Sequence, residues 1–360
     1  MNKINRYSLL VVLAVLMVSL FPACNNDTPD APEKLALEFE SSINNNNGGE
    51  QARVINEDGV DKFVNGDEIV VDMWHTYNNA DATGTPNFMN RKTMTYEDGS
   101  WIYSPKQYWP NNSGEKMSAV AFYLAGAKNY TINDDLSNSL RNPYLEFSES
   151  NKLCDILASP MVSLSRVELE NGKIPLKFYH IMAKLKVNVR YWQEGVNKPE
   201  DWEKIYIESI AFWNNPKKAI FKGFNKEGDG TYTPIWEITE YAKGAGVWVV
   251  QNRTLEWGAD YTEVGTQYHY PFVCVHSSNH PDNAKLGFEL YNENAEGKRD
   301  TYGKTYDGNN IEKWFDAEIK GGYTYNIYVT IQPNYDIVLE LKKDDVSLGW
   351  DNDYSYSVGF

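Results

Sequence analysis

The sequence has few of the residues from which enzyme, metal and nucleic-acid sites are usually built. Its 360 residues include only 3 cysteines and 5 histidines, and 34 basic residues face 50 acidic ones. The formal net charge is −16. A surface of this charge lacks the basic patch that phosphate binding requires, so we expect no nucleic-acid partner.

Catalytic and metal-binding motifs are also missing. The sequence contains no Gly-x-Ser-x-Gly motif, no phosphate-binding glycine loop and no Cys/His cluster at metal spacing. The closest histidine pair, His276 and His280, falls in an expected polar loop, and His180 lies in an apolar stretch typical of a core histidine. Cys154 and Cys274 are too few for a disulfide scaffold. We predict no cofactor, no metal and no catalytic residue, and a hydrolase ranks third among the functions considered.

The N-terminus has the features of an export signal that ends at a lipidated cysteine. Lys3 and Arg6 precede an uncharged apolar run at Tyr7–Phe21, which is shorter than the about 20 residues that a membrane-spanning helix needs. A basic start followed by a short apolar core is typical of a signal peptide. Ala23 before Cys24 suits a bacterial lipoprotein cleavage site. The alternative is an ordinary cleavage at which Cys24 is incidental.

From these features we expect residues 1–23 to be a signal peptide and Cys24 to be the lipidated residue. The polar residues 24–34 would then be a tether. Acyl chains on the cysteine would hold the protein stably at the outer membrane as a surface-exposed lipoprotein.

Most of the remaining chain alternates apolar and polar residues with period two, which is typical of half-buried strands. Two dipeptides predict hairpin turns, Asp98-Gly99 and Gly321-Gly322, because glycine tolerates positive φ. Helical periodicity is rare, and residues 310–317 would form at most two helical turns. The sequence therefore predicts an all-β protein of two tandem antiparallel β-sandwich domains, at residues 35–194 and 195–360.

The first predicted strand, Leu35–Ile43, is set apart from the others by an Asn/Gly tract at Asn44–Gly49, and Arg53 follows this tract. A strand in front of a loop that a protease can cut can leave its sheet and be replaced by a strand of another molecule. This arrangement predicts polymer assembly.

Several segments resemble the fimbrillin family of lipoprotein pilus subunits from Gram-negative anaerobes. The resemblance extends from about Leu35 to Trp350 and depends on the order and spacing of short markers. These are Ala52-Arg53, Phe63–Ile69, Gly99-Ser100-Trp101, Tyr108-Trp109-Pro110, Ala121–Tyr123, Leu176–His180, Ile207–Asn214 and Gly322–Ile327 ahead of Trp350.

The resemblance implies two transthyretin-like β-sandwich domains and a fimbrial subunit that supports adhesion. It implies that a protease cuts after Arg53 and that the strand with Leu35, Leu37 and Phe39 is expelled. A strand of another fimbrial subunit then fills the groove by β-augmentation. The donor candidate is Val338–Phe360, in which the alternating residues are Tyr354, Tyr356 and Val358.

Two alternatives remain open. Arg53 can be an ordinary loop arginine, in which case the chain would stay a lipid-anchored monomer suited to an anchor. The 11 tryptophans and 25 tyrosines suit strands and sandwich cores, but exposed ones would stack on sugar rings. A lipid-anchored glycan-binding protein without polymerisation is therefore the second function, and its candidate residues are Trp248, Trp257, Tyr268 and Tyr270.

Overall fold

The structure is a computed structural model of the whole chain. The residues that it describes are 35–43, 62–77, 82, 84–110, 115–124, 130–132, 143–146, 156–169, 172–198, 204–213, 216–228, 230, 232–241, 247–270, 285–293, 296–301, 310–314, 321–333, 337–343 and 355–357.

The described part of the chain is nearly all β, as predicted. Its strands are β1 (Glu38–Ile43), β2 (Glu68–Tyr77), β3 (Met89–Glu97), β4 (Ser100–Ile102), β5 (Glu115–Tyr123), β6 (Tyr130–Ile132), β7 (Pro143–Glu146), β8 (Leu157–Ala158), β9 (Val162–Ser165), β10 (Lys173–His180), β11 (Ala183–Tyr191), β12 (Lys204–Trp213), β13 (Pro216–Lys226), β14 (Tyr232–Tyr241), β15 (Val247–Glu256), β16 (Thr262–Tyr270), β17 (Lys285–Glu293), β18 (Arg299–Thr301), β19 (Asn310–Trp314), β20 (Thr324–Ile331), β21 (Ile337–Lys343) and β22 (Ser355–Ser357). A 3-10 turn, η2, covers Arg166–Glu168.

One local prediction was wrong. The segment 310–317 was expected to form helical turns, but its first part is β19, which pairs with β17. Pairing along a neighbouring strand satisfies the backbone of this short segment, whereas an isolated helix of two turns would lack tertiary support. The described ranges contain no helix with the length and hydropathy of a membrane span.

The N-terminal half is an eight-stranded sheet rolled around a core. The strands follow the order β1-β10-β8-β5-β2-β3-β4, and β9 also pairs with β5. The first and last strands of this order, β1 and β4, lie beside each other. Apolar side chains from the inner face fill the enclosed space, among them Leu37, Ile69, Met117, Leu176 and Phe178. The rolled sheet thus has a single interior core.

A four-stranded sheet, β14-β13-β7-β6, covers the outer face of the rolled sheet. Trp74 of β2 and Phe122 of β5 point to this side and pack with Phe221 of β13. The rings of Phe122 and Phe221 meet edge to face with centroids 6.4 Å apart. Strands β2 and β5 are therefore buried on both faces.

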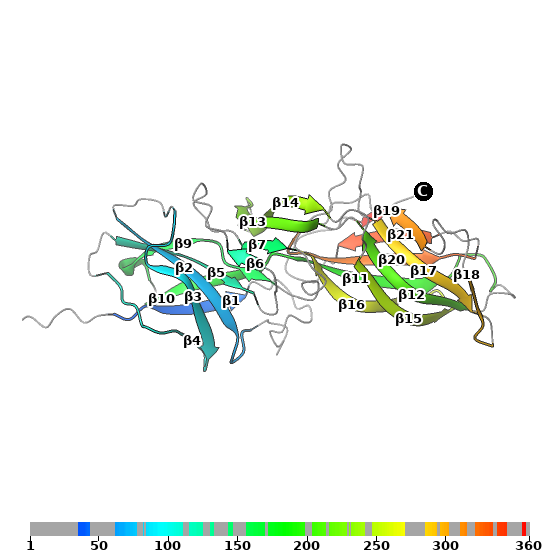
Figure 1. Cartoon of the computed structure of the whole chain (residues 1–360), viewed down its shortest axis with the longest axis horizontal. Coiled ribbons are helices and arrows are strands. Elements are labelled where there is room, and N and C mark those ends of the chain that lie inside the picture. The colour runs from blue at the N-terminus through cyan, green and yellow to red at the C-terminus, as the bar shows by residue number, and fades with distance from the viewer. Residues whose placement is uncertain are drawn as a thin grey trace, which may run out of the picture.

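The C-terminal half is a pair of packed sheets. One has the order β16-β11-β20-β21-β22, and the other has the order β15-β12-β17-β18 with β19 also on β17. Their facing side chains form a continuous core that includes Val189, Ile207, Leu290, Ile327 and Leu339. Figure 1 shows the two halves side by side along the long axis of the molecule.

Strand pairing does not follow the predicted division at residue 195. Strand β11 precedes this residue but lies in the C-terminal half, between β16 and β20. Strands β13 and β14 follow it but cover the N-terminal half, where β13 pairs with β7 and with β14. Period-two alternation identifies a strand but does not specify its sheet, so the sequence pattern did not reveal this crossing.

Candidate functional site

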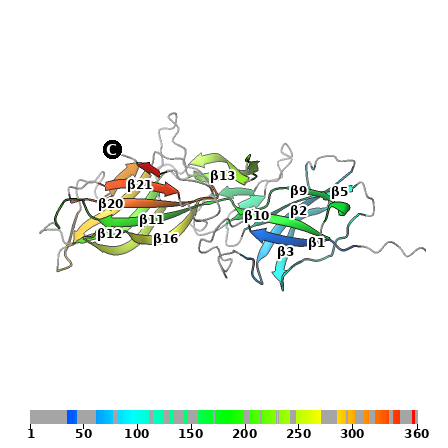
Figure 2. The ribbon, with the colours of Figure 1, turned by 180° about the vertical axis from the view of Figure 1, so that it is seen from behind.

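The site that the sequence predicts is the place where the first strand docks. Strand β1 runs parallel to β10 with a continuous register from Glu38 opposite Lys173 to Ile43 opposite Phe178. Figure 2 shows β1 alongside β10 at the border of the N-terminal half. A parallel pair without a local connection depends on the rest of the fold to bring the two strands together.

The segment 103–109 holds the other side of this first strand. The amide of Leu37 donates to the carbonyl of Gln107 at 2.9 Å, and the amide of Trp109 donates to the carbonyl of Leu35 at 3.0 Å. Ala36 and Tyr108 form an antiparallel bridge between these two bonds. Residues 35–37 are thus bonded to the segment 107–109, and residues 38–43 are bonded to β10, so the strand lies in a groove of the rolled sheet.

Three side chains of the strand fill the bottom of this groove. Leu37, Phe39 and Ile43 are 2%, 3% and 7% exposed and belong to the N-terminal core. Burying a side chain of this size stabilises by about 1.5–3 kcal/mol. Leu35 was predicted as part of the same plug, but it is 36% exposed and lies at the rim.

Two aromatic residues after β3 bind the strand through polar atoms. Trp101 Nε1 donates to Ser41 Oγ at 3.0 Å, and the Tyr103 hydroxyl donates to the carbonyl of Leu37 at 2.7 Å. The Tyr103 ring also meets the Phe39 ring edge to face, with centroids 6.0 Å apart. Burial raises the pKa of Tyr103 above its ordinary value, so its hydroxyl keeps the proton that it donates.

Sequence reasoning did not assign these two roles. Trp101 appeared only as a marker of the family resemblance, and Tyr103 and Ile43 had no assigned function. The contacts join residues 60 and 66 positions apart, a separation at which period-two patterns carry no information.

Several predicted residues lie outside the described ranges: Cys24, Arg53, Tyr354 and Val358. Tyr356 is in β22, opposite Leu341 of β21. The donor candidate was predicted to start at Val338, but this residue is in β21, between β20 and β22. Its neighbours Ile337 and Leu339 are buried in the C-terminal core. A donor that leaves this core intact would therefore start after β21.

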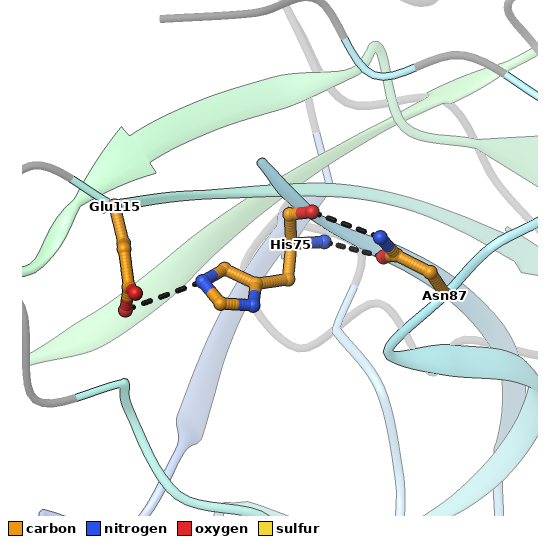
Figure 3. Close-up of polar contacts among 3 residues, drawn as sticks. All are labelled: His75, Asn87 and Glu115. Carbon is orange, nitrogen blue, oxygen red and sulfur yellow. Dashed lines mark hydrogen bonds and ion pairs between the residues drawn. The ribbon is translucent and has the colours of Figure 1, made fainter. Parts of the chain in front are cut away.

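A separate polar cluster lies on β2 and β5 (Figure 3). His75 Nε2 is 3.2 Å from the carboxylate of Glu115, and both side chains are largely buried. The Asn87 side chain accepts from the His75 amide at 2.7 Å and donates to the His75 carbonyl at 2.9 Å. Asn87 thereby pairs the backbone of β2 as a neighbouring strand would, so the cluster has a structural explanation. The described residues contain no group of three metal ligands.

Comparison with known proteins places the chain in a family. A fimbrillin-like family profile matches residues 52–344. The chain belongs to the fimbrillin-like family. The resemblance found in the sequence is therefore confirmed. This fimbrillin-like match begins just before Arg53, after β1, and ends at residue 344, before β22.

The chain is also similar to solved structures. A fimbrial protein from Bacteroides vulgatus is 16% identical, with a TM-score of 0.56 over 85% of this chain and 98% of that one. A putative cell adhesion protein from Bacteroides uniformis is 14% identical, with a TM-score of 0.47 over 86% and 98% of the two chains. The first likeness shows a shared fold. No curated protein matches the sequence.

The predicted glycan-binding aromatics do not form a described surface of this fimbrillin-like chain. Trp257 is half-buried, and its ring meets Tyr191 edge to face with centroids 5.0 Å apart. The side chains of Trp248, Tyr268 and Tyr270 lie outside the described ones. Among the predicted site residues, the structure brings together Leu37 and Phe39 in one groove.

Proposed function

We propose that this chain is a non-enzymatic structural subunit of a cell-surface fimbria. Its membership of the fimbrillin-like family and its fold, which a Bacteroides fimbrial protein shares, support this role. Its partners would be other fimbrial subunits, either further copies of this chain or related chains, and the assembled fibre would support adhesion.

Strand exchange is the proposed assembly mechanism, and the docking of β1 is the observation that supports it. The strand contributes buried Leu37 and Phe39 to the core, yet its hydrogen-bond partners are residues far along the chain. A groove that offers main-chain hydrogen bonds along a strand and buries its alternate apolar side chains is the arrangement in which one strand replaces another.

Cleavage after Arg53 is the proposed trigger. It would separate β1 and the segment with Cys24 from the rest of the chain. Departure of β1 would expose part of the core that it shares with Phe63 and Phe178, whose rings lie 5.1 Å apart. Because exposed apolar surface is unfavourable, the open groove would favour capture of a donor strand. The proposed donor is the C-terminal segment with Tyr354, Tyr356 and Val358 from another subunit.

The anchoring step is proposed from the sequence. Lipid on Cys24 would hold the unprocessed subunit at the outer membrane, and cleavage would release it. A stalk subunit would therefore lose its lipid and β1 together, whereas an uncleaved subunit would keep both and would suit the base of the fibre.

The experiment is to treat the folded mature chain with an arginine-specific protease and to follow intact mass together with native electrophoresis. We expect a species that begins at Val54 and forms a ladder of multimers. The matched control is Arg53→Gln, which should remain intact at this position and monomeric.

Two outcomes would contradict the proposal. A chain that is cut at Arg53, has released residues 24–53 and remains monomeric at high concentration would rule out strand exchange. An uncut chain on native cells that still carries lipid on Cys24 would rule out the processed stalk role and would favour an anchor or the glycan-binding alternative.

A further inference from the structure

We propose that Trp101 makes the groove selective for donor strands that carry serine or threonine at the place of Ser41. This inference rests on the proposed strand exchange and specifies the chemical pattern of the partner strand. It assigns Trp101 as a specificity-determining residue of the groove.

The position of Trp101 fixes what its indole nitrogen can contact. Its side chain is 6% exposed and is held between Phe63 and Tyr96, with ring centroids 5.0 Å away in each case. The Nε1–H group donates to Ser41 Oγ at 3.0 Å. Since an indole nitrogen is a donor only, an occupant without an acceptor at this place would leave a buried N–H unpaired.

The other buried polar contacts to this strand do not depend on which side chains it carries. The Tyr103 hydroxyl, the Gln107 carbonyl and the Trp109 amide all bond to backbone atoms of residues 35–37. Any extended strand presents those atoms, so these bonds contribute affinity without selecting a side chain. The ion pair between Lys173 and Glu38 spans 3.7 Å between exposed side chains and contributes little.

The inward positions of β1 therefore define a pattern. They carry a large aliphatic residue at 37, an aromatic residue at 39, a small hydroxyl residue at 41 and a β-branched residue at 43. The outward residues Glu38 and Glu40 are exposed. A donor that runs parallel to β10 would match this pattern at alternate residues.

The C-terminal segment of this chain fits the pattern incompletely. If Tyr354 and Tyr356 take the places of Leu37 and Phe39, Val358 takes the place of Ser41. Valine has no acceptor for Trp101 Nε1–H. The preferred donor is therefore a related subunit with serine or threonine at this position, and a second copy of this chain is a weaker donor.

The test uses the folded mature chain with a specific protease site introduced at residues 44–49 and cut after folding. A fluorescent peptide with the sequence of residues 35–43 is allowed to exchange with the retained β1. Unlabelled peptides then compete: the same sequence, its Ser41→Val and Ser41→Thr forms, residues 352–360, and residues 352–360 with Val358→Ser.

An unpaired buried donor weakens binding by roughly tenfold. We expect Ser41→Val to require about tenfold more peptide for half-displacement, and Ser41→Thr to differ little from the parent. Val358→Ser should strengthen the C-terminal peptide. The difference between serine and valine should disappear in a Trp101→Phe groove and persist in Trp109→Phe. Trp109 is the matched control, because it is buried in the same core and its Nε1 has no hydrogen-bond partner among the described residues.

The outcomes separate the two proposals. If the labelled peptide never enters the cut protein, strand exchange itself fails. If it enters but serine and valine peptides compete equally on the unmutated groove, the selectivity assigned to Trp101 is overturned while strand exchange stands. The peptide series on the unmutated groove decides this even if Trp101→Phe does not fold.

Discussion

Replacing Phe39 with alanine should release β1 without unfolding the C-terminal half. Phe39 is 3% exposed and packs edge to face on Tyr103. Truncation of a buried phenylalanine costs about 3–5 kcal/mol, because it removes apolar contacts and leaves a cavity. At 1.4 kcal/mol for each factor of ten, the population with β1 undocked should rise by roughly a hundredfold or more.

Native-state hydrogen exchange measures this opening residue by residue. In Phe39→Ala, the amides of β1 and the Leu37 amide bonded to Gln107 should exchange faster by the same factor. Amides of β12 in the C-terminal core should keep their protection, since among the described residues Phe39 belongs to the N-terminal core and not to the C-terminal one. Glu40→Ala is the matched control, because Glu40 lies next to Phe39 in β1 with its side chain exposed.

The reasoning would be refuted by either of two results. Unchanged protection of β1 would mean that Phe39 does not hold the strand in the groove. An equal loss of protection in both halves would mean that β1 opens only when the whole molecule unfolds, and such a strand is not poised for exchange.

Three further predictions test the surrounding fold. Burial raises the pKa of Tyr103 above its ordinary value of 10.0, and burial together with a neighbouring tyrosine raises that of Tyr179 to about 12. Their contribution to stability is therefore full below about pH 10 and is lost as pH rises through each raised pKa, which is about 12 for Tyr179. In urea unfolding across this pH range, the variant with both Tyr103→Phe and Tyr179→Phe should lose less free energy of unfolding than the parent. Phe221→Ala should cost about 3–5 kcal/mol and reduce protection in β2 and β5 rather than in β12, although Phe221 lies beyond residue 195. Gly321→Ala should lower the melting temperature, because its Cβ would lie 2.3 Å from a backbone carbonyl oxygen, whereas Gly228→Ala meets no atom within 4 Å and should be nearly neutral.

The sequence predicted where strands occur better than it predicted which strands pair with each other. The alternation of apolar and polar residues correctly indicated an all-β chain, because burial of one face of a strand produces this alternation within the strand itself. Strand β11 shows the limit of this information. Its residues alternate as those of a sandwich strand do, but its partners β16 and β20 lie much further along the chain. No local pattern encodes which distant strand will pair.

The two glycine dipeptides show the same limit at turns. Asp98-Gly99 joins paired strands β3 and β4, and both residues have positive φ, so the predicted hairpin is confirmed. Gly321-Gly322 precedes β20, but the segment before it, residues 315–320, lies outside the described ranges, so this hairpin stays a prediction. The described contacts show a further role: Gly321 allows close approach to the carbonyl of Ile181, and the amide of Gly322 donates to the carbonyl of Met182.

The sequence predicted the strand of the candidate site but not the groove that receives it. Alternation identified Leu37 and Phe39 as inward-facing residues of the first strand, and both are buried. The groove that receives them is built by β10 and by residues 101–109. These residues share no periodicity with β1, so the sequence indicated the strand but not the chemistry of its pocket.

The covalent link behind β1 explains why cleavage would act as a trigger without any change in the groove. Every described hydrogen bond of β1 joins it to residues at position 101 or later. Because β1 and its partners belong to one chain, the strand stays covalently linked to its groove as long as the chain is uncut. Covalent linkage of two binding partners gives an effective concentration of about millimolar order, and a donor strand must compete against it. Cutting the chain removes this advantage, after which β1 is retained according to its free concentration. Donor strands at micromolar concentration should therefore exchange into the cut protein and not into the intact one, although both offer the same contacts.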